Sequence, residues 1–138
     1  MSYQLNYQSA SYLANADLSN NQQQLVILDT TTGKVRMPTS TAEFAEGVLE
    51  NAPLANMPAT VSYQGVTKVI VDAAYSVGTA LMARYDSTSG ATGLFNTGSG
   101  TLATTPGAAR LKMLESSTQA GDIVACRFID GSVTGILG

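Results

Sequence analysis

Short apolar runs separated by turn residues constrain the fold of this chain more than any other feature. The runs begin at Leu25, Val35, Gly47, Val61, Lys68, Ala80, Arg110 and Asp122. Such runs, bounded by Gly, Pro, Asn and Asp, are typical of β-strands joined by tight turns. No segment keeps a helical period over three turns, and the Ser40/Glu43 spacing of a capping box predicts one helical turn at most. The sequence therefore predicts an all-β fold, a small sandwich or barrel-like (β-tulip-like) domain.

A weak internal repeat runs through the β-rich part of the chain. The Asp-Thr-Thr-Thr-Gly stretch at 29–33 resembles Asp-Ser-Thr-Ser-Gly at 86–90, and each follows an apolar run. The Val-Leu-Glu stretch beginning at Val48 resembles Met-Leu-Glu beginning at Met113, and alternating runs follow at Val61 and Val124. The pattern predicts two copies of one strand–turn–strand unit, with chance similarity between β-turns as the alternative.

Residues 1–24 differ from the rest of the chain because Asp17 is their only charged side chain and 20–24 form an Asn/Gln cluster. We predict an extended N-terminal arm, followed by a β-rich domain over residues 25–138. The large side chains of the arm are candidate partner-binding residues: Tyr3, Leu5, Tyr7, Tyr12 and Leu13. We expect the arm to become ordered by adding a strand to another chain, and its deletion over 2–20 to leave the domain folded. A disordered tail is the alternative.

The side chains needed for common enzyme chemistry are scarce. The sequence contains no histidine and one cysteine, so it can form neither a Ser-His-Asp triad nor a His-ligated metal site. Cys126 lies in an apolar run and is predicted to be a buried structural thiol. The carboxylates that could serve a glycosidase are Glu43, Glu46, Glu50, Asp122 and Asp130, but the chain has no Trp to form a sugar platform. We therefore predict no enzymatic activity, no cofactor and no metal.

Charge is sparse, at 12% of residues, and the net charge is −3. The seven lysines and arginines are scattered along the sequence, so no nucleic-acid partner is expected. No apolar run is long enough to span a membrane, and residues 1–10 lack the features of a secretory signal. A weakly charged surface suits a protein packed against neighbours, although a neutral secreted or adhesive β protein would fit the composition equally well.

Five short stretches occur in the order found in a family of capsid decoration (cement) proteins of tailed bacteriophages, which the chain resembles over about residues 25–130. The stretches lie at 25–35, 45–52, 61–66, 73–82 and 119–126. A Gly-Val-Leu-Glu sequence at 47–50 leads to a Gly-Asp-x-Val sequence at 121–124, as in that family. The chain departs from the pattern at 56–58, where Asn-Met-Pro stands in place of a Gly-containing turn, and residues 1–24 match no family pattern.

The resemblance implies a structural role in a virion. Proteins of this family sit as homotrimers at three-fold and local three-fold positions on the outer surface of an icosahedral head. They clamp adjacent capsomers of the major capsid protein and use no cofactor. The chain would thus be made in the host cytoplasm and end on the outer capsid surface. The alternative is a phage tail or receptor-binding β module that recognises a ligand on the host surface.

Overall fold

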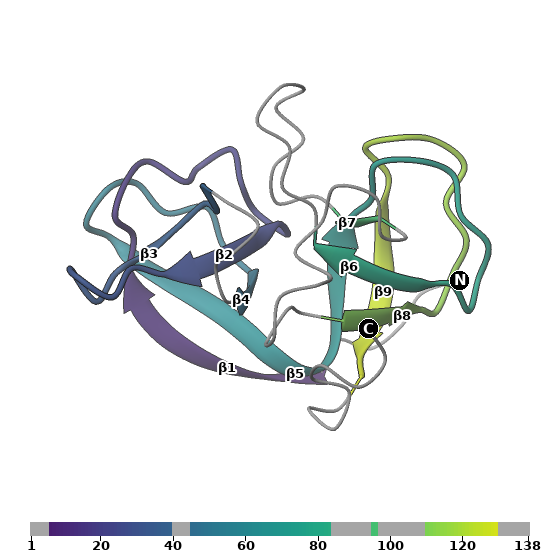
Figure 1. Cartoon of the computed structure of the whole chain (residues 1–138), viewed down its shortest axis with the longest axis horizontal. Helices are drawn as coiled ribbons and strands as arrows, with labels where there is room; N and C mark the ends of the chain where they lie inside the picture. Colours follow the sequence, from purple (N-terminus) through teal and green to yellow (C-terminus); the bar gives the residue numbers. More distant parts are fainter. Residues whose placement is uncertain (1–5, 40–44, 84–94, 97–109, 130–138) are drawn as a thin grey trace.

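The computed structural model describes residues 6–39, 45–83, 95–96 and 110–129, which contain nine β-strands and no helix. The strands are β1 (Asn6–Leu13), β2 (Leu25–Leu28), β3 (Val35–Arg36), β4 (Ala45–Leu49), β5 (Pro58–Ile70), β6 (Ala80–Ala83), β7 (Phe95–Asn96), β8 (Arg110–Met113) and β9 (Ile123–Phe128). All pair antiparallel in one sheet that curls into a half-barrel (Figure 1). The all-β prediction is confirmed, and the helical turn predicted at 40–43 lies outside the described residues.

The thirteen-residue strand β5 connects the two lobes visible in Figure 1. Its first part pairs with β1 over residues 58–66 and with β4 at 61–62, and its second part pairs with β9 over 66–70. Gly65 lies between the two parts and has a φ of 97°, a conformation that glycine adopts without a steric penalty. The first lobe contains β1 to β4 and the first part of β5, and the second contains the rest of β5 and β6 to β9. The apolar runs at Val61 and Val69, predicted as separate strands, are therefore one strand.

The two lobes have the same strand order. It is β1-β5-β4-β2-β3 in the first lobe and β5-β9-β8-β6-β7 in the second. Each lobe curls until its ends meet in a single bridge, between Ala14 and Val35 in the first and between Val71 and Phe95 in the second. By this correspondence β1 is the counterpart of the second part of β5.

Backbone hydrogen bonds show which residue of the first lobe corresponds to which residue of the second. In the first lobe, the Gln23 N–H donates to the Leu49 carbonyl, and the Leu49 N–H donates to the Gln24 carbonyl. In the second lobe, the Gly78 N–H donates to the Met113 carbonyl, and the Met113 N–H donates to the Thr79 carbonyl in the same way. Gln23 and Gly78 both have positive φ, 67° and 88°. Leu49 is thus the counterpart of Met113, whereas the sequence comparison had aligned Val48 with Met113.

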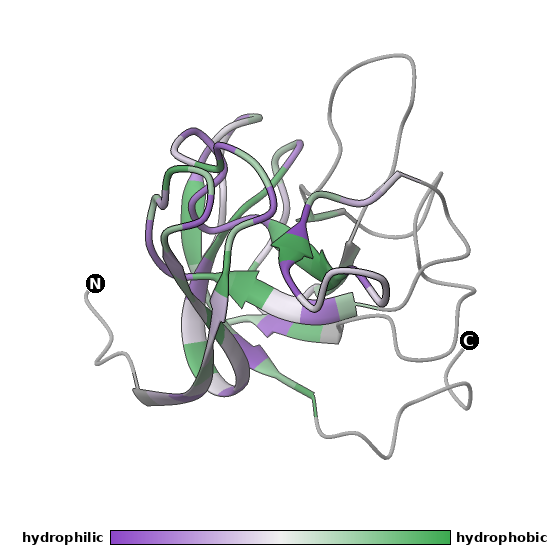
Figure 2. Cartoon of the chain, turned by 90° about the vertical axis from the view of Figure 1, so that its left-hand side faces the viewer, coloured by the Kyte–Doolittle hydropathy of each residue, from purple (hydrophilic) through white to green (hydrophobic). Residues whose placement is uncertain are grey.

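The buried apolar side chains form one core in each lobe. The first-lobe core contains Ala14, Leu18, Val26, Val35, Leu49, Ala59 and Val61. The second-lobe core contains Val69, Val71, Leu81, Phe95, Leu111, Met113, Val124, Cys126 and Phe128, together with Leu25 and Val48 from the first lobe. Successive strand residues point to opposite faces, so neighbouring Leu25 and Val26 reach different cores. In Figure 2 the green, most apolar residues lie mainly on the strands.

The N-terminal segment differs from the predicted arm. Residues 6–13 form β1, paired with β5 of the same chain, while Ala14 is 0% exposed and Leu18 2% exposed in the first-lobe core. The side chains of β1 can be mostly polar because main-chain hydrogen bonds hold the strand against β5. The apolar side chains that anchor the segment in the core, Ala14 and Leu18, follow β1 in the sequence. Deletion of residues 2–20 would remove that strand and both core side chains, so the rest of the domain is not expected to stay folded unchanged.

We predict that Leu18→Ala lowers the free energy of unfolding by about 2–5 kcal/mol, because it opens a cavity in the first-lobe core. Leu13→Ala is the matched control: this leucine is 44% exposed, so its loss should change stability by no more than about 0.5 kcal/mol. Urea denaturation measures both variants. Equal stabilities for the two would mean that residues 14–24 do not belong to the folded domain.

Candidate partner-binding surface

The candidate binding residues predicted in the N-terminal segment have different structural roles. The Tyr12 hydroxyl donates to a Glu46 carboxylate oxygen, which, together with burial, raises the pKa of Tyr12 to about 12, and its ring packs on the first-lobe core. Tyr7 lies opposite Gly65. Burial, and to a smaller extent the negative charge of Glu50, raises the pKa of Tyr7. Leu13 is exposed, whereas Tyr3 and Leu5 lie outside the described residues. Of the five, Leu13 is thus the described residue most available to a partner.

Leu13 is one of three exposed apolar residues whose backbones lie close together at the end of the first lobe. Leu54 is 58% exposed, Met57 is 52% exposed, and we call these two residues with Leu13 the apolar end. Their backbones are held together because the Ala14 N–H donates to Met57, and the Met57 N–H donates to Leu54, at 3.0 Å each. Pro58, also exposed, pairs with Leu13 across β1 and β5.

The apolar end carries no charged residue of its own. The loop at 51–58 contains no charged residue, and its nearby cation, Lys34, donates a 2.7 Å hydrogen bond to the Asn56 side chain. The Asn56 backbone has a φ of 63° and its N–H donates to the Ala14 carbonyl, so the loop has a defined conformation on β1. Transfer of apolar side chains from water to a protein interface is favourable, and the loop has no charged group of its own whose desolvation would cost free energy.

Sequence reasoning missed Leu54 and Met57. Met57 lies in the stretch at 56–58 that departs from the family pattern, and Leu54 lies two residues before that stretch. A detectable signal was present, because a turn rich in Gly, Asn and Asp is the usual connection and this one carries two large apolar residues instead.

The Gly-Val-Leu-Glu stretch at 47–50 has a structural role. A Cβ on Gly47 would lie 2.1 Å from the Ser62 carbonyl oxygen, so only glycine permits β4 to approach β5 this closely. Val48 enters the second-lobe core and Leu49 the first-lobe core. Glu50 accepts hydrogen bonds from the hydroxyls of Ser62 and Thr67, which lie on opposite sides of Gly65. This stretch therefore fixes both cores and the shape of β5.

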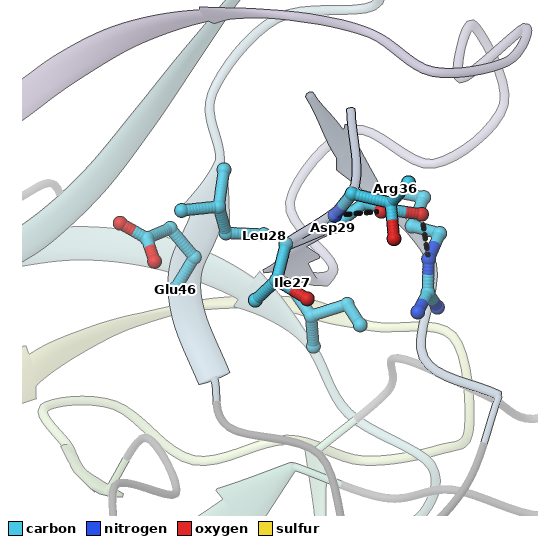
Figure 3. Close-up of a pocket in the computed structure, with 7 residues that line it drawn as sticks. Ile27, Leu28, Asp29, Arg36 and Glu46 are labelled. Carbon is cyan, nitrogen blue, oxygen red and sulfur yellow. Dashed lines mark hydrogen bonds and ion pairs between the residues drawn. The ribbon is translucent and has the colours of Figure 1, made fainter. Parts of the chain in front are cut away.

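A surface pocket of about 420 Å³ lies beside β2. It is lined by Ile27, Leu28, Asp29, Thr30, Thr31, Arg36 and Glu46 (Figure 3). Asp29 forms a 3.1 Å ion pair with Arg36, and it accepts backbone hydrogen bonds from the turn that lower its pKa. Glu46 lies on the other side of Leu28 with its carboxylate directed away from Arg36 (Figure 3). Among the described residues, Glu46 therefore stands apart from the ion pair of Asp29 and Arg36.

The remaining candidate residues also take part in the fold. Asp122 accepts hydrogen bonds from the Thr118 and Gln119 backbones, the first of which is the main cause of its lowered pKa. Cys126 is buried in the second-lobe core, and burial raises its pKa to about 12, so the thiol is protonated at neutral pH. Glu43 and Asp130 lie outside the described residues.

No protein-family model matches the chain, and a search of curated proteins finds no significant match. Within the residues that the structure describes, no three His, Cys, Asp or Glu side chains are grouped so as to hold a metal ion. No helix in the same part of the chain is long and apolar enough to cross a membrane.

We predict opposite pH dependences for two carboxylate variants. Burial is the main cause of the raised pKa of Glu50, so Glu50 contributes stability below its unfolded pKa of about 4.3 that is lost as the pH rises through its folded pKa. Glu50→Gln should therefore gain stability relative to the wild type between pH 4 and 7. The pKa of Asp122 is lowered, so its contribution is lost as the pH falls, and Asp122→Asn should cost most at pH 7.

Denaturant unfolding at a series of pH values measures both variants against the wild type. A Glu50→Gln curve that runs parallel to the wild-type curve throughout would show that the Glu50 carboxylate is not held in a desolvated position beside Ser62 and Thr67.

Proposed function

We propose that this protein is a capsid decoration protein, which binds the outer surface of an icosahedral phage head and stabilises it by clamping adjacent capsomers of the major capsid protein. The observation that carries the proposal is the apolar end. It presents Leu13, Leu54 and Met57 to solvent on a β scaffold, and the loop at 51–58 has no charged residue of its own. Such a surface suits permanent contact with another protein and provides no chemistry.

The order of the family motifs supports the same proposal. The Gly-Val-Leu-Glu and Gly-Asp-x-Val stretches lie on or beside β4 and β9, the strands that pair with β5 on either side of Gly65. The resemblance therefore covers residues that determine the shape of the domain, and we extend the proposal to the β-tulip-like architecture expected of the family.

A small contact surface explains why a decoration protein would act in several copies. An apolar end of three side chains supplies on the order of a few hundred Å², below the roughly 800 Å² per partner of a typical stable interface. Joining copies makes the later contacts intramolecular and multiplies the affinity. We propose a homotrimer at three-fold and local three-fold positions, because a three-fold object fills such a site without mismatch. A receptor-binding module is less well supported, because no aromatic side chain is among the residues of the described part of the chain that line the pocket of Figure 3.

We predict that the double variant Leu54→Ser, Met57→Ser binds heads lacking the protein about thirtyfold more weakly than the wild type, because each substitution removes roughly 1 kcal/mol of apolar burial. Val77→Ser is the control, since Val77 is 59% exposed but belongs to the second lobe. Sedimentation of heads with fluorescently labelled protein gives the affinities. Unchanged binding by the double variant would exclude the apolar end as the capsid contact.

A further inference from the structure

Three cations that are scattered in the sequence share one face of the second lobe. Arg127 on β9 lies directly opposite Lys112 on β8, and on its other side opposite Val66 on β5. Lys68 lies opposite Ala125, two residues from Arg127 on the same strand. Directly paired residues of antiparallel strands point to the same face, and so do alternate residues of one strand. We call Lys68, Lys112 and Arg127 the basic face.

The basic face is open and its charges are uncompensated. Lys112 and Arg127 are exposed and Lys68 is partly exposed. None of the three side chains forms an ion pair or a hydrogen bond with any residue in the described part of the chain. The carboxylate of Glu115 is directed to the Ala125 N–H instead, at 2.9 Å. Like charges directly opposite each other on neighbouring strands destabilise a sheet, so the pair Lys112 and Arg127 costs stability in the isolated chain.

The correspondence between the lobes shows that the equivalent face of the first lobe is a packing interface. The pair Leu25 and Val48 of the first lobe corresponds to Ala80 and Lys112 of the second, and Ser62 corresponds to Arg127. Leu25, Val48 and Ser62 are 0% exposed, and the first two pack into the second-lobe core. The second lobe thus presents to solvent the face that the first lobe buries, with two cations in place of Val48 and Ser62.

The chemistry of this face selects its partner. A second copy of the chain stacked in the same way would have to bury the lysine and arginine, which is unfavourable without carboxylate partners. Beyond the cations, Ile123 on β9 is 51% exposed and lies opposite the partly buried Ile70. A nucleic acid would be bound by more phosphate contacts than three cations provide, and Ile123 offers it no stacking surface. Carboxylates beside an apolar side chain match the basic face better than a second copy or a nucleic acid does, because they would pair with the cations and cover Ile123.

We propose that the basic face binds an acidic protein surface that carries an apolar side chain beside its carboxylates. Resting on the proposed function, this partner is the capsomer adjacent to the one that the apolar end contacts. The basic face and the apolar end belong to different lobes (Figure 1), so one subunit can contact two capsomers at once. The clamp then has an apolar contact in one lobe and a charged contact in the other.

Variants that remove single charges test the proposal on heads lacking the protein. Lys112→Gln and Arg127→Gln should each weaken binding about two- to fivefold, and the double variant about tenfold, as exposed charge pairs do. Arg36→Gln removes the same charge from the first lobe, where Arg36 pairs with Asp29 and not with the loop at 51–58, and should change binding less than twofold. The wild-type affinity should fall as the salt concentration rises, and that of the double variant should fall less. The melting temperature of the double variant should equal or exceed that of the wild type, since a repulsive pair is removed.

If the wild type binds heads and the double variant binds as well as Arg36→Gln, the basic face is overturned and the proposed function stands. Failure of the wild type to bind heads would overturn the proposed function, and soluble probes then decide on the face. Fluorescence anisotropy with poly-L-glutamate should show salt-sensitive binding that the double variant loses. Absence of this binding, or tighter binding to a DNA duplex, would refute the acidic protein partner.

Discussion

The structure depends on β5 being shared by two lobes. One strand of thirteen residues supplies the last strand of the first lobe and the first strand of the second, and changes direction at Gly65. Glu50 links both parts of β5 through Ser62 and Thr67, and Gly47 allows β4 to approach the same strand. A change at this junction would alter both cores together, whereas a change at the far end of either lobe would alter one. The relative position of the two lobes, and of any surfaces they carry, is therefore fixed by a few residues around the bend.

Two lobes with the same strand order have acquired different surfaces. The first lobe buries Leu25 and Val48 against the second lobe, and its far end carries exposed Leu54 and Met57. Within the described ranges, no further unit covers the equivalent face of the second lobe, which carries the exposed Lys112. Internal repetition thus supplies a body with two unlike ends, and the proposed clamp uses one end for each of two neighbouring capsomers.

The strands could be predicted from the sequence because each buried run is short, apolar and bounded by turn residues, as at Leu25 and Ile123. The position of residues 6–24 could not be predicted from the sequence, because β1 is stabilised by main-chain pairing with β5, about fifty residues away. Such pairing leaves little trace in the polarity of the side chains. The basic face was invisible for a similar reason, since Lys112 and Arg127 become neighbours only through the register of β8 and β9. Of the proposed contact surfaces, the sequence indicated Leu13 alone.

Cryo-electron microscopy of heads carrying this protein tests the central claim most directly. The account predicts density for the subunit on the outer surface, at three-fold and local three-fold positions. The loop at 51–58 should lie against one capsomer, and the outer face of β8 and β9 should lie against carboxylates of the next. Density at the tail or on two-fold axes would contradict the account, as would a subunit on the outer surface whose Leu54, Met57, Lys112 and Arg127 all face solvent.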